Sequence, residues 1–372
     1  MKSNRSERIS DILTLALCFV LLTSLGIALF FKPQKSFSER ENRALSLFPT
    51  LSANAFTNGS FFADVASFYS DQFPCREVFT ALRTHSEKLL LKCENGGIIF
   101  AKDGYLLQKD ATDFNILNKN LSVINDFCKK YGAYFIIAPQ SIYVLSDKLP
   151  TIYGAELEEK SHTTIQNSCS NTTAITDALK NAAANGEYVY FKTDHHWTAE
   201  GAYIAYTEIA PYLEISPYKK NAFTEETAAQ NFLGTSFSKS GLYSADGDTV
   251  TLLRYNGDEA LSLYNEETKT TEKGLYRYEK LKEKDKYLVF LGGNFSRISI
   301  TNENGARERL LIIKDSFANS LIPFLAMHFD LDVIDPRYYK GNISEIISQN
   351  EYKNILMLFG AGTLGNTRIA LF

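Results

Sequence analysis

Residues 310–316 read Leu310-Leu311-Ile312-Ile313-Lys314-Asp315-Ser316, an apolar run that ends in polar residues. A short run of this kind is typical of a strand buried on both faces of a parallel sheet. Three other runs share the pattern: 134–138, 188–191 and 355–359. Because candidate helices follow the runs at 134, 188 and 310, we expect an α/β fold with a doubly wound, mostly parallel sheet.

The expected α/β domain covers residues 96–372. Within it, residues 98–107 are typical of a hairpin that turns at Asp103-Gly104, and a helix is expected around residues 116–130. Residues 241–286 differ, because they are charged and rich in Tyr and contain the turn Asn256-Gly257. We interpret them as an inserted β-rich excursion.

The composition bounds the class of protein. The chain has 372 residues, of which 45% are hydrophobic and 22% charged, enough for a sizeable core and too apolar for extended disorder. Its 39 basic and 43 acidic residues are spread along the chain, with a net charge of −4. No basic block indicates a surface that tracks phosphates, so nucleic acid is not expected as a partner.

An uncharged stretch of twenty residues runs from Ile12 to Phe31. At about 1.5 Å per residue it spans roughly 30 Å, the thickness of the hydrocarbon core of a bilayer. A cleaved signal peptide is the alternative, but the run ends Ala28-Leu29-Phe30-Phe31 and offers no good cleavage site. We expect a retained single-pass anchor, a short cytoplasmic tail (residues 1–11) and a bulk that lies outside the cytoplasm.

A linker and a membrane-proximal helical segment are expected over residues 32–95. Apolar residues recur at helical spacing over residues 61–69 and again over residues 78–90. Between them, Asp71-Gln72-Phe73-Pro74 indicates a turn. Four cysteines lie outside the apolar stretch, and the sequence does not give their pairing: Cys75, Cys93, Cys128 and Cys169.

Two of the apolar runs end in residues that can carry chemistry. Asp194, His195, His196 and Trp197 follow the run at 188–191, just before a helix for which Thr198 is a good N-cap. Ser316 follows the run at 310–313, at a turn between strand and helix, where a hydroxyl is exposed and its own N–H can face an oxyanion.

Together these loops supply the parts of a centre for nucleophilic acyl transfer. Ser316 would attack, a histidine would take its proton, and a carboxylate would orient the imidazole. In an extended chain, residues i and i+2 lie on one side and residue i+1 on the other. We therefore assign His196 as the base and Asp194 as its orienting group, and we expect His195 to point away.

Other interpretations use the same residues. A serine at a turn between strand and helix is common without catalysis, and Asp194-His195-His196 is also compatible with a zinc site. Adjacent histidines diverge, however, so neither a metal nor another cofactor is expected. Ser236 is a rival nucleophile, but no apolar strand precedes it.

The motifs Asp194-His195-His196-Trp197, Lys314 to Ser320 and Asp335 to Tyr339 together resemble the DHHW protein family of bacteria. That family is related to the SGNH hydrolase-like domains of the alginate O-acetyltransferases. The likeness extends to Glu41-Asn42-Arg43 and to residues 71–74 near the apolar stretch. It implies an SGNH-like fold in which Asp and His precede Ser, acting on surface polysaccharide at the outer face of the membrane.

The resemblance also implies roles for single residues. Asp194, His196 and Ser316 match the triad, and Arg337 falls near the active site, where a structural ion pair is an equally good interpretation. Candidates for oxyanion or substrate contacts are Gly293, Asn294, Asn319, Trp197 and His195. The expected activity is that of a serine O-acetyltransferase or acetylesterase with an acetyl-Ser316 intermediate, and a membrane-bound O-acyltransferase is implied as acetyl donor. The alternative is a non-catalytic polysaccharide-binding or assembly protein, for which the excess of Phe and Tyr would supply stacking surfaces.

Overall fold

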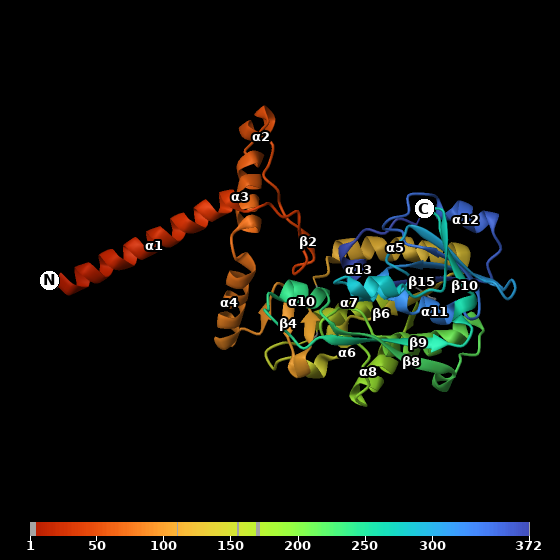
Figure 1. The fold of residues 1–372 in the computed structure, drawn as a ribbon. Helices are drawn as coiled ribbons and strands as arrows, with labels where there is room; N and C mark the ends of the chain where they lie inside the picture. Colours follow the sequence, from red (N-terminus) through yellow and green to blue (C-terminus); the bar gives the residue numbers. More distant parts are fainter. Residues whose placement is uncertain (1–4, 110, 155, 169–171, 372) are drawn as a thin grey trace. The chain divides into compact units, whose positions relative to one another are not determined.

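The computed structural model describes residues 5–109, 111–154, 156–168 and 172–371 (Figure 1). The chain divides into two compact units. The first contains the residues through Lys92 together with Gly241–Ser244, and the second contains Cys93–Ser240 and Ala245–Phe372. Each unit is described by itself. Cys169 lies outside the described residues, and Cys18 and Cys75 are free cysteines exposed to solvent.

The first unit begins with the long helix α1 (Arg5–Phe31). Its segment Glu7–Leu29 is long and apolar enough to be a single membrane span or a signal sequence. The expected pair of helices then follows as α3 (Ser60–Gln72) and α4 (Arg76–Leu89), and α2 (Ala53–Thr57) precedes them. The chain turns between α3 and α4 at Phe73–Cys75, as Pro74 predicts.

The two short motifs of this unit contact each other. Arg43 donates two hydrogen bonds to the Asp71 carboxylate, at 3.0 and 2.6 Å, and Asp71 also accepts from the backbone N–H of Ser46 at 2.9 Å. The side chain of Gln72 bonds both backbone groups of Lys35, at 3.1 and 2.8 Å. These contacts, which we call the clasp, fasten the linker with its hairpin β1 (Phe37–Ser38) and β2 (Arg43–Ala44) to the end of α3.

The second unit is built on an eight-stranded sheet with the order β11-β10-β12-β14-β13-β15-β6-β7. Strands β14, β13, β15, β6 and β7 run parallel, and β12, β10 and β11 complete the sheet in antiparallel fashion. The bounds are β6 (Tyr134–Ala138), β7 (Thr172–Ala174), β10 (Leu261–Asn265), β11 (Thr270–Lys273), β12 (Arg297–Asn302), β13 (Arg309–Lys314), β14 (Asp330–Ile334) and β15 (Asn354–Gly360).

Helices cover both faces of this sheet, which explains the unbroken apolar runs. In β13, Leu311 and Ile313 pack with α5 (Phe114–Tyr131), α12 (Ile343–Gln349) and α13 (Ala361–Asn366), and α7 (Glu156–Gln166) reaches the same cluster. Leu310 and Ile312 point the other way, toward α6 (Ser141–Val144), α8 (Thr176–Ala184), α9 (Ala199–Ile209) and α11 (Ile322–Leu325). Alternate residues of one strand thus enter different cores.

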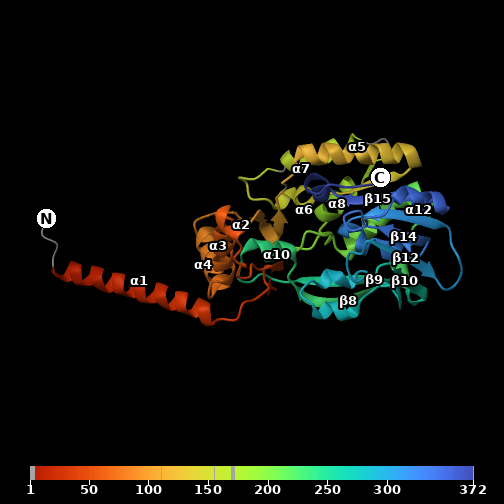
Figure 2. The ribbon, with the colours of Figure 1, turned by 90° about the horizontal axis from the view of Figure 1, so that it is seen from above.

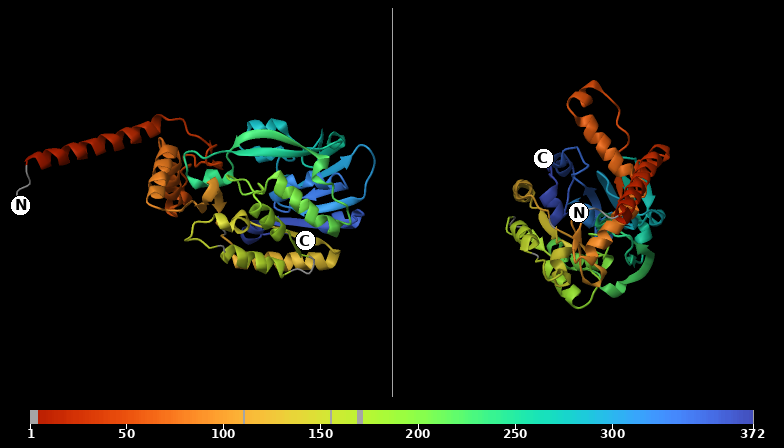
Figure 3. Two further views of the ribbon diagram at one scale, coloured as in Figure 1. Left: turned by 90° about the horizontal axis from the view of Figure 1, so that it is seen from below. Right: turned by 90° about the vertical axis from the view of Figure 1, so that its left-hand side faces the viewer.

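The hairpin predicted at 98–107 is present as β4 (Ile98–Phe100) and β5 (Leu106–Gln108), to which β3 (Glu94–Asn95) adds a third strand. A separate ribbon pairs β8 (Phe223–Phe232) with β9 (Asp248–Tyr255). Figures 2 and 3 show this ribbon and α5 on opposite sides of the central sheet. The helix α10 (Thr235–Ser240) connects the two strands of the ribbon.

Residues 241–286 are β-rich, as expected, but they do not form a separate excursion. Strands β10 and β11 extend the edge of the central sheet, and β9 pairs with β8, which begins before this segment. The charged composition of this segment matches the edge strand β11, whose residues are all exposed, whereas β10 beside it is mostly buried.

Candidate active site

The turn that follows β13 carries the candidate nucleophile. The backbone N–H of Asp315 donates to the carbonyl oxygen of Leu358 at 3.1 Å. The buried Asp315 carboxylate accepts from the N–H groups of Phe317, at 3.0 Å, and of Gly360, at 2.7 Å. An aspartate that accepts from N–H groups in this way caps the turn that follows it. Ser316 is the first residue of that 3-10 turn, so the cap fixes its position.

The run at 188–191, predicted to be a strand, is instead a loop. Tyr190 pairs with Trp197 in a single isolated bridge. The backbone N–H of Phe191 donates to the carbonyl oxygen of His196 at 3.2 Å, and the backbone N–H of Thr198 donates to the carbonyl oxygen of Val189 at 3.0 Å. The chain therefore doubles back on itself. A run of apolar side chains indicates that a segment is buried, not that it pairs with another strand. Here the buried segment is the loop itself.

Asp248 on β9 anchors this loop, a role that no pattern in the sequence indicates. Its carboxylate accepts from the N–H groups of Lys192 and Thr193, both at 2.8 Å, and from the Thr193 hydroxyl at 2.5 Å. Burial raises the pKa of Asp248, and these hydrogen bonds oppose that shift. The loop is therefore held from both sides, by its own bridge and by β9.

Asp194, His196 and Ser316 are brought together although 120 residues separate the last two. The distance from His196 Nε2 to Ser316 Oγ is 2.8 Å, and that from His196 Nδ1 to Asp194 Oδ1 is 2.6 Å. Both are within hydrogen-bond reach. Because Nδ1 faces a carboxylate, it carries the proton, which leaves the lone pair of Nε2 toward the hydroxyl.

The Asp194 carboxylate is buried and fully occupied. Besides the imidazole, it accepts from the backbone N–H of His196 at 3.0 Å and from the N–H and hydroxyl of Thr235 at 2.8 and 2.9 Å. Burial alone would raise its pKa, but the neighbouring His195 and His196 and these donors hold the pKa well below its usual value. Gly234 makes the approach of this segment possible, because a Cβ there would lie 2.4 Å from that of Asp194.

His195 does not point away from the site, as the extended-chain argument predicted. Its ring centroid lies 3.8 Å from that of His196, because the loop is not extended there. Its Nδ1 lies 2.7 Å from the Thr235 hydroxyl, and a third of its side chain is exposed. Burial first, and then the proximity of His196, lowers the pKa of His195, so this ring is neutral at neutral pH.

Tyr287 contacts both candidate catalytic residues and was missed by the sequence analysis. Its ring stacks on the His196 imidazole with centroids 3.9 Å apart and planes 6° apart. Its hydroxyl donates to the backbone carbonyl of Ser316 at 3.0 Å and lies 3.2 Å from Ser320 Oγ. Nothing in a charged, Tyr-rich segment distinguishes this tyrosine from its neighbours before folding.

Trp197 was a candidate for substrate contact, but it is completely buried. Its Nε1 donates to the carbonyl of Phe317 at 3.0 Å and to Ser320 Oγ at 2.9 Å. A ring without solvent access cannot stack on a sugar, so we correct that expectation. Trp197 instead connects the loop that carries the histidine to the turn that carries the serine.

The remaining candidates surround Lys314, which is buried. Its Nζ donates to the side-chain oxygens of Asn319, at 2.7 Å, and of Asn294, at 3.1 Å. The Asn319 amide nitrogen in turn donates to Asn294 Oδ1 at 3.2 Å. Burial lowers the pKa of Lys314 to about 8. Asn319 is thus engaged inside this cluster, whereas the amide nitrogen of Asn294 has no protein partner among the described residues.

Arg337 forms the ion pair that was its alternative interpretation. Its Nε and Nη2 donate to the buried carboxylate of Asp335 at 2.9 and 2.6 Å. Burial would lower the pKa of the guanidinium, but Asp335 raises it above its ordinary value, so Arg337 stays charged. It also lies near enough to His195 to lower the pKa of that ring.

Neither the rival nucleophile nor the metal interpretation uses this geometry. Ser236 Oγ is buried and has no partner among the described residues, whereas the imidazole of His196 faces Ser316. Asp194, His195 and His196 do offer ligand atoms within 4.8 Å of one another. His195 Nδ1, both ring nitrogens of His196 and both oxygens of Asp194 already make hydrogen bonds, to Thr235, to Ser316 and between Asp194 and His196.

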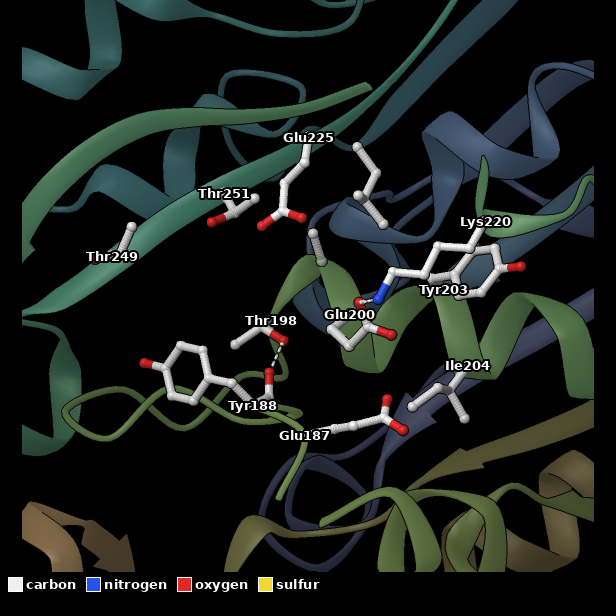
Figure 4. Close-up of a pocket in the computed structure, with 12 residues that line it drawn as sticks. Glu187, Tyr188, Thr198, Glu200, Tyr203, Ile204, Lys220, Glu225, Thr249 and Thr251 are labelled. Atoms are coloured by element: carbon white, nitrogen blue, oxygen red, sulfur yellow. Dashed lines mark hydrogen bonds and ion pairs between the residues drawn. The ribbon is translucent and has the colours of Figure 1, made fainter. Parts of the chain in front are cut away.

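A cavity of about 480 Å³ lies between α9 and the β8–β9 ribbon (Figure 4). Glu187, Glu200 and Glu225 line it, and Lys220 reaches across to pair with Glu200. Neither Ser316 nor His196 is among the residues that line it. A smaller cavity of about 290 Å³ is lined by His195 and by Phe317, the residue next to Ser316.

Comparisons with known proteins agree with the motifs. The family described as DHHW protein matches residues 163–334. Among solved structures, a DHHW family protein from Eubacterium siraeum is 23% identical with a TM-score of 0.60, covering 74% of this chain and 94% of its own. Bacillus cereus PatB1 with a sulfonyl adduct is also 23% identical with a TM-score of 0.60, covering 74% and 98%.

The O-acetyltransferase domain of Pseudomonas putida AlgJ is more distant, at 16% identity and a TM-score of 0.45 over 73% of this chain and 93% of that one. A search of curated proteins gives no match. The similarity to the first two structures shows a shared mixed α/β fold. Over residues 163–334 this chain matches the DHHW family, as its motifs predicted.

Proposed function

We propose that this protein is a serine O-acetyltransferase or acetylesterase that acts on cell-surface polysaccharide. The observation that carries the proposal is the hydrogen-bonded series Ser316–His196–Asp194, with 2.8 and 2.6 Å between the heavy atoms. A hydroxyl, an imidazole and a buried carboxylate in this order are the parts that acyl transfer needs. The proposal includes an SGNH-like, doubly wound fold, to which the parallel strands and the helices on both faces lend support.

In the first half-reaction, Ser316 Oγ attacks the carbonyl carbon of an acetyl group while His196 Nε2 takes the hydroxyl proton. The tetrahedral intermediate collapses, the donor's oxygen leaves with the proton from His196, and acetyl-Ser316 remains. In the second half-reaction a sugar hydroxyl or water attacks the acetyl carbon, and His196 takes its proton. Collapse breaks the bond to Oγ, which recovers that proton. Asp194 keeps the imidazole oriented throughout.

The oxyanion would be stabilised by backbone and amide donors beside Ser316. The N–H of Ser316 has no protein acceptor among the described residues, as an oxyanion donor requires. Leu291, Gly292 and Gly293 all have positive φ, at 67°, 92° and 137°. Glycine adopts such angles freely, whereas Leu291 does so at an energetic cost, and strain of this kind is typical of functional loops. We assign the free amide of Asn294, at the end of this loop, and the N–H of Gly293 as the further donors.

The membrane setting is part of the proposal. Helix α1 would remain as the anchor, with the second unit outside the cytoplasm and a membrane-bound O-acyltransferase as acetyl donor. The printed descriptions of AlgJ as an O-acetyltransferase domain and of PatB1 with a sulfonyl adduct fit acyl chemistry of this kind. Extraction of isolated membranes with carbonate tests the anchor, because an integral protein stays in the pellet and a cleaved, secreted protein does not.

Labelling with a fluorophosphonate or a sulfonyl fluoride tests the chemistry. We expect the full chain to be labelled and to hydrolyse p-nitrophenyl acetate, and we expect Ser316→Ala to lose both. Ser236→Ala is the matched control, because that serine is buried and makes no hydrogen bond to the imidazole, and it should be labelled normally. A wild-type protein that is neither labelled nor active would instead support a non-catalytic polysaccharide-binding or assembly protein.

A further inference from the structure

The smaller cavity lies directly beside the candidate nucleophile. Its volume of about 290 Å³ is at the small end for ligand pockets, which begin at about 300 Å³. Phe317, on its wall, is the residue after Ser316. His195, also on its wall, has its ring 3.8 Å from that of His196. The cavity is therefore walled in part by the residues adjacent in sequence to His196 and Ser316.

The lining is rich in groups that bind sugars by hydrogen bonds. It contains three carboxamides, from Gln108, Gln140 and Asn366, and four hydroxyls, from Ser141, Thr235, Thr363 and Thr367. Gln140 is free to turn its side chain into the cavity, since its amide makes no hydrogen bond to protein in the part of the chain that the structure describes. Amides and hydroxyls placed around a small pocket fix the orientation of a polar ligand.

The charge of the lining is unbalanced. Among the described residues that line the cavity, Lys239 is the only permanently charged one and none is Asp or Glu, while His195 is neutral at neutral pH. Among the described residues Lys239 has no carboxylate partner, and its contact with the oxygen of Gln108 is long, at 3.4 Å. In the larger cavity, by contrast, Lys220 is paired with Glu200. Lys239 is exposed to solvent, so it is accessible to an anionic group and can donate charge-assisted hydrogen bonds to it.

We infer that this cavity is an acceptor subsite for a sugar that bears a carboxylate or a phosphate. Lys239 binds the anion, and the surrounding amides and hydroxyls bind the sugar hydroxyls. The neighbouring sugar of the same chain then lies toward Ser316. This inference rests on the proposed function, from which it takes the polysaccharide acceptor, and it adds the charge of that acceptor.

Isothermal titration calorimetry on the full-length Ser316→Ala protein in detergent tests the subsite without turnover. The probes are trigalacturonate for a carboxylate, glucose 6-phosphate for a phosphate, and maltotriose as the neutral control. We expect one of the two anionic probes to bind better than maltotriose. Lys239→Gln should weaken that binding roughly ten-fold or more, because a charge-assisted hydrogen bond is lost. Lys220→Gln is the matched control and should bind as the parent does.

Gln140→Ala provides a second variant, which should weaken binding of the anionic probe while leaving the charge of the cavity unchanged. The subsite is disproved if maltotriose binds as well as the anionic probes, if no probe binds at millimolar concentration, or if Lys239→Gln binds normally. Fluorophosphonate labelling of the wild-type serine is independent of these results. If the serine is labelled but no anionic probe binds, the subsite is disproved and the proposed chemistry stands. If an anionic probe binds but the serine is not labelled, the proposed chemistry is disproved and the subsite stands.

Discussion

At the scale of single residues, the site depends on how firmly the imidazole is held. His196 is fixed at three places: its Nδ1 and backbone N–H bond Asp194, and one ring face packs on Tyr287. Tyr287 also holds the serine through the carbonyl of Ser316. Tyr287 touches no reacting atom. We therefore regard it as a residue that positions Nε2 of His196 relative to Oγ of Ser316.

We expect Tyr287→Phe to lower the rate of acetyl-ester hydrolysis moderately and Tyr287→Leu to lower it more. Phenylalanine keeps the stacked ring but loses the hydrogen bonds of the hydroxyl to Ser316 and Ser320. Because the bond to the Ser316 carbonyl is worth about 1 kcal/mol, the rate of acetyl-ester hydrolysis should fall by roughly five-fold to ten-fold. Leucine also removes the stacking and should lower the rate further. Steady-state kinetics with p-nitrophenyl acetate check this, and the loss should fall on kcat with little change in KM.

A merely structural tyrosine would give a different result. In that case both variants would lower the thermal unfolding midpoint in parallel with activity, and Tyr287→Phe would change kcat and KM alike. Equal activity of the phenylalanine variant and the wild type would remove the positioning role of the hydroxyl.

At the scale of elements, the clasp gives a physical reason for the Glu41-Asn42-Arg43 motif and the motif at residues 71–74, both of which lie in the first unit. The Asp71 carboxylate accepts hydrogen bonds from Nη1 and Nη2 of Arg43 and from the backbone N–H of Ser46, and the Asp71 side chain is only 10% exposed. Bidentate pairs of this kind are among the stronger polar contacts at partly buried positions. The clasp therefore decides whether the linker is ordered on α3.

Asp71→Asn should release the linker without unfolding the second unit. We expect faster cleavage by trypsin between Lys32 and Arg43, and a loss of about 1–3 kcal/mol in the local free energy of opening. Glu87→Gln is the control, because its ion pairs with Arg83 and Lys92 are solvent-exposed and contribute little. Equal cleavage of the two variants would mean that the clasp does not hold the linker.

The same scale shows what the sequence could and could not predict. Strand β13 was predictable because its residues are apolar on both faces, a pattern that only a covered sheet explains. The run at 188–191 has the same composition, yet Asp248, more than fifty residues away, holds its end as a loop. The juxtaposition of Asp194 and His196 was predictable from spacing alone, whereas Tyr287 and Thr235 reach the site only through tertiary contacts.

At the scale of the whole molecule, the buried His162 and the partly buried His328 connect stability to pH. His162 bonds the Thr176 hydroxyl through Nε2 at 2.6 Å, and its Nδ1 has no partner among the described residues. Burial first, and then Lys180, lowers its pKa to about 4. Burial first, and then Arg307, lowers the pKa of His328, whose Nε2 lies 2.7 Å from the Tyr206 hydroxyl, to about 4.

The sign of the effect follows from proton binding in the two states. An unfolded histidine gains its proton as the pH falls through about 6.5, whereas these two remain neutral in the folded protein until about pH 4. Between these values the unfolded state binds more protons, so the free energy of unfolding falls as the pH falls. The slope is at most about 1.4 kcal/mol per pH unit for each fully buried histidine, and it is smaller for the partly exposed His328.

Burial raises the pKa values of Asp248 and Asp285, which act in the opposite sense, so the test compares two proteins rather than two pH values alone. Urea unfolding of the full chain in detergent at pH 7 and pH 5 gives the slope for the wild type and for His162→Gln. We expect the variant to lose less stability over this interval, by about 1–2 kcal/mol, because glutamine does not titrate. Parallel losses in the two proteins would mean that His162 is protonated in the folded state well above pH 4.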